Sequence, residues 1–190
     1  MMYSIVEGLM TQIMTGDNLS VMSGKVGADD KSVKSALDLA LPLLLGAVSS
    51  KAAKPEGASA IMSSISGMGA DNPVDSISGY LNSPEKLQGP DLLSSILGSQ
   101  LQPIQQSISK STGLPPAIVG QILGILLPLV IGSLSKSTTQ DMGARDLSAF
   151  LGEQSKIAMS GSPEATAVMN ELLASQKGSG GLMGFIKRFM

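Results

Sequence analysis

The chain has 190 residues, enough for one domain with a hydrophobic core or for two small units that share one. Its 13 basic and 15 acidic residues give a formal net charge of −2, and it contains no histidine, cysteine or tryptophan. This composition argues against a disulfide-stapled fold, a zinc site and a basic nucleic-acid-binding surface, and it removes the commonest general base and the thiolate nucleophile.

The charged fraction is low for a globular protein. Charged residues make up 15% of the chain, whereas about 25% is typical of soluble domains. Apolar residues make up 43%, which excludes a disordered chain. We therefore expect a neutral surface that favours association with other molecules, and no cofactor, metal or small-molecule substrate.

The first predicted helix covers residues 5–14. Ser4 and Glu7 have the spacing of a capping box at its start. No basic segment followed by an apolar core precedes Glu7, so no signal peptide is predicted and a cytoplasmic location is expected.

The second prominent helix is predicted over the apolar residues from Val33 to Val48, with Asp29 or Asp30 as its N-cap. Lys34 and Asp38 lie on its polar face, and Pro42 is expected to bend or split it because proline lacks the backbone N–H. Its apolar residues recur at helical spacing and predict a buried face: Val33, Ala36, Leu37, Ala40, Leu41, Leu44, Leu45 and Val48.

Shorter helices are predicted between and after the long ones. Proline favours the first turn of a helix, where its missing N–H has no intrahelical partner. The prolines at such positions are Pro55, Pro73, Pro84, Pro90, Pro103 and Pro163. No alternating run of β-branched residues is long enough for a strand, so the fold class is all-α.

An uncharged stretch of 25 residues, from Ser111 to Ser135, contains the most apolar helix. Its length exceeds the roughly 18 apolar residues that suggest a membrane span. Pro128 interrupts it, and Gly120 and Gly124 have a spacing that lets another helix come close. The alternative to a membrane span is a core helix that is surrounded on every side.

An internal repeat distinguishes between these two interpretations. Shifting the chain by 86 residues aligns residues 26–65 with 112–151, with 10 identities in 40 pairs. The pairs include Gly27 with Gly113, Pro42 with Pro128, Gly46 with Gly132, and Gly57 with Gly143. Asp38 in the first copy leaves only 12 uncharged residues before Lys51, too few to cross a bilayer about 30 Å thick. A buried helix is therefore favoured for both copies.

The repeat predicts a multi-helical bundle from a tandem duplication, with two proline-kinked central helices. Its units are residues 1–88 and 89–178, which we expect to share one core. Residues 179–190 are expected to form a glycine-rich linker and a short amphipathic helix, whose sequence resembles residues 89–97. This tail then starts an incomplete third unit, and its candidate contact residues are Leu182, Met183, Phe185, Ile186 and Phe189.

Few residues suggest catalysis. The carboxylate pairs Asp29 with Asp30 and Asp141 with Asp146 precede helices, where N-capping explains acidic residues. Two neighbouring serine and lysine pairs, at 109–110 and 135–136, point about 100° apart on a helix and do not form a dyad. We therefore expect no enzyme activity.

The motifs "LALPLLLGAVSS" and "ILLPLVIGSLSK", each preceded by a glycine and followed by a Gly-Ala helix start, resemble the bacterial YidB-like family, domain-of-unknown-function family 937. The resemblance runs from about Val21 to Leu151, and the late "GSGGLMGFI" is also similar. It implies a helical bundle with two central buried helices and transfers no catalytic residue.

The leading functional hypothesis is a non-catalytic structural or interaction module that binds itself through its neutral surface and its tail. A tail that docks on the next molecule generates a head-to-tail ring or filament. The tail can instead fold back on its own chain. The alternative function is membrane association, through residues 112–135 or through the amphipathic C-terminal segment.

Overall fold

The computed structural model describes the backbone of residues 4–139 and 141–186, and the side chains of this part as far as residue 174. The described residues form helices and contain no strand, so the all-α prediction is confirmed. The α-helices are α1 (Ile5–Met14), α2 (Asn18–Val26), α3 (Asp30–Ala52), α4 (Pro55–Met68), α5 (Ile77–Asn82), α6 (Gly89–Leu97), α7 (Leu101–Thr112), α8 (Pro116–Ser137), α9 (Ala144–Ser160) and α10 (Pro163–Ile186). Short 3₁₀ turns are η1 (Pro73–Asp75), η2 (Pro84–Leu87) and η3 (Gly98–Gln100).

Helix α3 begins where the sequence predicts. The Asp29 carboxylate accepts a hydrogen bond of 3.0 Å from the Ser32 N–H, which satisfies one of the free donors of the first turn. All eight residues of the predicted apolar face are buried. From Leu39 to Leu45 every residue is buried, so the middle of α3 is enclosed on all sides.

Helix α8 is enclosed over an even longer run, from Ile122 to Gly132. The sequence predicts an apolar surface all round only for α8, but α3 and α8 each have 13 buried residues. The two helices therefore share the centre of the bundle. The polar face of α3 is limited to its first turns, around Lys34 and Asp38, which explains why its later turns are as buried as those of α8.

Both central helices continue through their prolines. Pro42 lies inside α3 and Pro128 lies inside α8, and neither helix ends there. A break at these positions, the alternative to a bend, is therefore absent. Both helices are long and apolar enough to cross a membrane, although 72% of the most apolar 18-residue stretch of each is buried inside the bundle.

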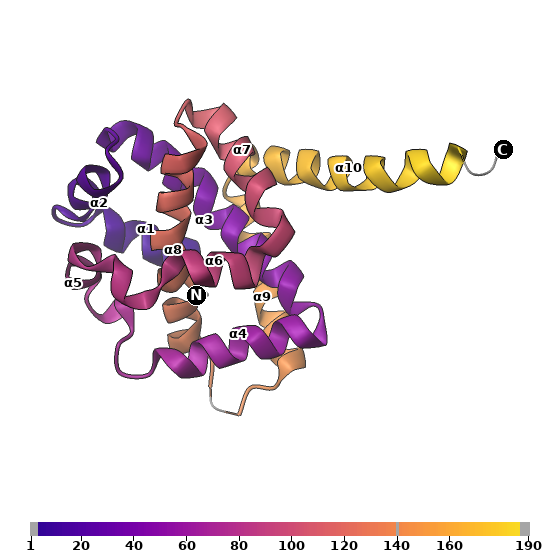
Figure 1. Ribbon diagram of the computed structural model, residues 1–190. Helices are drawn as coiled ribbons and strands as arrows, with labels where there is room; N and C mark the ends of the chain where they lie inside the picture. The colour runs from indigo at the N-terminus through magenta and orange to yellow at the C-terminus, as the bar shows by residue number, and fades with distance from the viewer. Residues whose placement is uncertain (1–3, 140, 187–190) are drawn as a thin grey trace.

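The two central helices contact each other and have different main neighbours. Helix α3 packs extensively against α9 and the start of α10, whereas α8 packs against α4, η1 and α6. Figure 1 shows α4 and α9 at the same end of the bundle as the last turns of α8. One continuous core includes residues from α1 to α10, so neither half has a separate core.

Helix boundaries recur with the sequence repeat. Helices α2 and α7 end 86 residues apart, and α3 and α8 begin 86 residues apart. Gly27 and Gly113 close α2 and α7 with the same left-handed backbone, φ 74°. The Gly27 N–H donates to the backbone carbonyl of Ser23, and the Gly113 N–H donates to that of Ser109, each over 2.9 Å. A positive φ favours glycine because it lacks a Cβ.

The start of α1 differs from its prediction. Ser4 is the N-cap residue, but its hydroxyl makes no capping hydrogen bond and has no partner among the described residues. The Ile5 N–H instead donates to the Gln154 side chain from α9 over 3.1 Å. The predicted capping box with Glu7 is therefore wrong, because the Ser4 hydroxyl makes no capping bond, and a long-range contact from α9 satisfies a different donor of the first turn.

Candidate interaction site

Helix α10 has two parts with different surroundings. Its first turns rest on the bundle: Ala165 and Val168 are buried, and the Thr166 hydroxyl donates to the Met159 carbonyl of α9 over 2.7 Å. Beyond these turns α10 leaves the bundle and extends away from it (Figure 1). Leu173 of α10 is 49% exposed, which makes it an exposed large hydrophobic side chain on the described surface.

An apolar pocket of about 260 Å³ opens beside the first turns of α10. We call it the α10 base pocket. Its lining comes from α3, α7, α9 and α10 and consists of Gly46, Ala47, Ser49, Ser50, Gln100, Pro103, Ile104, Ser155, Met159, Met169, Leu172 and Leu173. None of these residues is charged, so the pocket suits an uncharged, apolar group.

Gly46 shapes this pocket by bringing two methionines close to α3. A Cβ at Gly46 would lie 2.8 Å from the Met169 Cε and 3.0 Å from the Met159 Cε. Its repeat partner Gly132 is also enclosed, more tightly, since a Cβ there would overlap Asn72. Each glycine thus admits side chains from the other half of the chain.

The remaining repeat pair does not keep one role. A Cβ at Gly57 would overlap the Lys51 carbonyl oxygen, so the α3–α4 connection requires glycine. Gly143 is the N-cap of α9, and its N–H donates to the Asp146 carboxylate over 3.1 Å. The two positions differ because α9 starts later in its repeat than α4 does.

The predicted tail residues belong to the projecting part of α10. The backbone at Leu182, Met183, Phe185 and Ile186 is helical, while their side chains and all of Phe189 lie outside the described residues. Helix α10 runs without a break through the glycines at 178, 180 and 181, where the sequence predicts a linker. Glycine weakens a helix by about 1 kcal/mol relative to alanine but does not prevent it.

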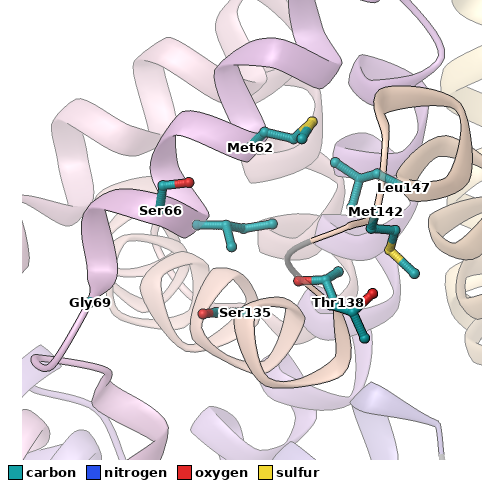
Figure 2. A pocket seen from close by; sticks show the side chains of 9 residues that line it. Met62, Ser66, Gly69, Ser135, Thr138, Met142 and Leu147 are labelled. Atoms are coloured by element: carbon teal, nitrogen blue, oxygen red, sulfur yellow. The ribbon is translucent and has the colours of Figure 1, made fainter.

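A second pocket, of about 390 Å³, lies between the ends of α4 and α8. Figure 2 shows Met62 and Ser66 of α4 on one side, Ser135 and Thr138 of α8 on the other, and Leu147 at its edge. Its lining has hydroxyls and methionines but no titratable side chain. It therefore offers hydrogen bonds without an acid or a base.

The acidic residues that the sequence suggests for catalysis lie at or near the starts of α3 and α9. Asp29 caps α3, and its hydrogen bonds with Ser32 lower the pKa of the carboxyl group. Asp30 accepts from the Ser20 hydroxyl over 2.7 Å, and Asp146 accepts from Gly143. Among the described residues, no hydrogen bond or ion pair gives Asp141 and Asp146 a shared partner.

The serine and lysine pairs are likewise engaged elsewhere. The Ser109 hydroxyl donates to the Leu114 carbonyl over 2.6 Å, and Lys136 forms an ion pair with Asp75. Among the described residues, no group of three or more acidic side chains is placed to hold a metal ion.

Two polar side chains that the sequence analysis missed hold α8 in place. The Tyr80 hydroxyl donates to the Ile125 carbonyl over 3.0 Å, and the Asn72 amide donates to the Gly132 carbonyl over 2.9 Å. Burial, helped by the charge of Glu85, raises the pKa of Tyr80. The short helices around them showed no periodic pattern, so these contacts had no sequence signal beyond the neighbouring Pro73.

Comparison with known protein families identifies a match. The family described as "Bacterial protein of unknown function (DUF937)" matches residues 8–137. The matched range begins earlier than the resemblance that the sequence shows from about Val21, and it ends earlier than Leu151. It leaves out α9 and α10. No curated protein and no solved structure matches the chain.

Proposed function

The chain belongs to the bacterial DUF937 family of unknown function, and we propose that it is a non-catalytic interaction module that associates with further copies of itself. The single observation that carries the proposal is α10, which is anchored by its first turns and then extends away from the bundle (Figure 1). A helix that makes no contact with its own bundle over several turns gains little stability from propensity alone. A partner that covers it supplies the missing packing.

The surface supports association. Only 15% of the residues are charged, so little like-charge repulsion opposes contact between copies. The exposed Leu173 and the α10 base pocket lie where α10 departs, which places apolar surface next to the projecting helix. The proposed partner is therefore the same protein, with no nucleic acid and no small-molecule substrate involved.

We also propose that the bundle arose by tandem duplication and that its central prolines bend α3 and α8. Three observations support the duplication: the helix boundaries match, glycine caps recur in pairs, and Gly46 and Gly132 are each enclosed by side chains from the other half of the chain. Proline inside a helix removes one hydrogen bond and pushes the preceding turn aside, which supports the bends. We further propose that, within this family, the chain is a YidB-like protein.

The test is the molar mass in solution. Light scattering of the full chain over a roughly hundredfold concentration range should show a mass above that of a monomer, rising with concentration. A full-length variant with Leu182→Asp and Ile186→Asp, and a chain that ends at residue 178, should stay monomeric while keeping the same helical circular dichroism. A monomeric full chain at every concentration would overturn the proposal.

Membrane association has its own readout in the same material. Flotation with anionic vesicles separates bound from free protein. If the full chain floats and the double aspartate variant does not, while light scattering shows monomers, the tail binds lipid rather than a second copy, and the proposal is wrong.

A further inference from the structure

A third pocket, between α1, α3 and α9, combines two carboxylates with a buried hydroxyl that lacks a hydrogen-bond partner. Its volume is about 210 Å³, below the roughly 300–1,000 Å³ of pockets for drug-sized ligands. We propose that this pocket binds a small aliphatic amine, a protonated primary ammonium on a short alkyl chain. The amine is a bound ligand rather than a substrate. The lining comes from one chain, so this inference does not depend on self-association.

The charge of the pocket favours a cation. Glu7 of α1 and Asp38 of α3 both belong to its lining, and no basic side chain does. Lys34 pairs with Asp38 over 3.0 Å, whereas Glu7 takes part in neither of the ion pairs that the described residues form. The pocket therefore keeps a negative charge that attracts a cationic ligand.

Two helix ends also meet at the pocket, and their effects oppose each other. Ile157, Ala158 and Gly161 line it from the last turn and the C-cap of α9, where a helix carries a partial negative charge of about one half. Ser4 and Glu7 line it from the first turn of α1, where the partial charge is positive and of the same size. The helix ends largely cancel, so the two full carboxylate charges decide the sign.

The Ser4 hydroxyl provides an independent sign of a missing ligand. Ser4 lines the same pocket and is 2% exposed, yet its hydroxyl has no hydrogen-bond partner among the described residues. Buried polar groups are nearly always bonded, so an unpaired one indicates a partner that the chain itself does not supply. A primary ammonium has three N–H donors and no acceptor, which suits a site where the hydroxyl oxygen and the carboxylate oxygens all accept.

The remaining walls favour an organic amine over a metal ion. Val6, Met10 and Ile157 are half-buried and line the pocket with apolar side chains. An alkyl stem packs along such walls while its charged end meets the carboxylates, as lysine stems do on protein surfaces. A hydrated Mg²⁺ gains nothing from them, and the described part of the chain has no group of three or more acidic side chains placed for a metal.

Methionine methyl NMR of the full chain tests the binding, with butylammonium as the probe at low salt. The Met10 methyl signal should shift and saturate because Met10 lines the pocket, while that of Met62, in the pocket between α4 and α8, should stay in place. Butanol, which lacks the charge, and tetramethylammonium, which lacks N–H donors, should not saturate in the same range. Equal shifts at Met10 and Met62, or equal binding of either control compound, overturn the proposal.

Two charge variants should change the affinity in opposite directions. Glu7→Gln should weaken butylammonium binding by about fivefold, because a partly exposed charge pair is lost. Lys34→Ala should strengthen it by about twofold or more, because Asp38 no longer has a competing lysine. The matched control Glu56→Gln, on α4 and outside the pocket, should bind like the original chain. Unchanged affinity in both Glu7→Gln and Lys34→Ala contradicts the proposal.

Ser4→Ala separates a ligand contact from a structural role. It should weaken butylammonium binding by about threefold or more, since the ammonium loses an acceptor. The ligand-free variant should unfold at the same urea concentration as the original chain or a higher one, because no unpaired hydroxyl stays buried. A less stable free chain with unchanged affinity would show that Ser4 serves the fold alone. Displacement of butylammonium by Mg²⁺ at a lower concentration would identify a metal site. Either result overturns the proposal.

Discussion

The two central helices differ in how closely a neighbour approaches them. On α8, Gly124 lies directly beneath α6, so close that a Cβ at Gly89 would overlap the Gly124 carbonyl oxygen. On α3, the position that aligns with Gly124 is Asp38, and α1 packs there less extensively than α6 does on α8. A pocket of about 210 Å³ lies between α1, α3 and α9, with Asp38 in its lining.

This comparison shows how one substitution separates two similar helices. Pro128 deprives the Gly124 carbonyl of its usual intrahelical donor, and Gly89 covers that oxygen. The corresponding turn of α3 faces solvent in part, where Lys34 pairs with Asp38 over 3.0 Å. A glycine at this position permits backbone contact, whereas the charged side chain of Asp38 lies where α1 packs less extensively.

The largest effect is expected at the α6–α8 crossing. Gly89→Ala should destabilise the protein by roughly 3 kcal/mol or more, because the new methyl group meets backbone that cannot move aside. Gly124→Ala is the matched control, since its Cβ would lie 3.6 Å from the nearest atom, an ordinary contact with Leu93. Urea unfolding measures both, and similar losses would contradict the proposed crossing.

The second prediction compares the aligned glycines of the two halves. Gly132→Ala should cost roughly 1–3 kcal/mol because its Cβ overlaps Asn72, which is itself bonded to the Gly132 carbonyl. Gly46→Ala should cost less, since the atoms it meets are the flexible ends of Met159 and Met169. Thermal unfolding of both variants checks the order, and a larger loss at Gly46 would show that the methionines cannot yield.

The third prediction concerns Tyr80, whose hydroxyl bonds to α8 and has no counterpart on α3. Tyr80→Phe should lower the free energy of unfolding by about 1 kcal/mol, because the Ile125 carbonyl loses a buried donor. Denaturant titration at neutral pH measures this loss. No change would mean that water replaces the hydroxyl.

The pH dependence of the same residue sharpens this result. The pKa of Tyr80 is raised above its ordinary value of 10.0 in the folded state, so its contribution is complete below that pH and is lost as the pH rises beyond it. Stability of the original chain should therefore fall above pH 10 more steeply than that of Tyr80→Phe. Parallel profiles would contradict the raised pKa.

The smallest effect is expected at the polar face of α3. Lys34→Ala should cost about 0.3–0.5 kcal/mol at low salt, and less at high salt, because the ion pair with Asp38 is about half exposed. Urea unfolding at two salt concentrations measures it. A loss as large as that of Gly89→Ala would mean that this face is packed rather than solvated.

Sequence reasoning predicted the helices and their buried faces well, and the contacts of the site poorly. Val33 to Val48 repeat at helical spacing, so their burial follows from local pattern alone. The α10 base pocket combines Gly46, Ile104 and Met169 from three distant segments, and no local pattern signals such a meeting. The contact of Gln154 with the Ile5 N–H links residues 149 positions apart and has no sequence signal for the same reason.

The sequence by itself determined the helical class, the two central helices, their N-terminal signals and the family to which the chain belongs, because helix periodicity, caps and motif residues are local properties. Only the tertiary structure decided that α9 packs on α3, that α4 contacts both central helices, that Gly124 receives α6, and that α10 leaves the bundle after its first turns. Those choices depend on which surfaces fit together once all helices compete for the same core, and that competition has no signature in any single segment.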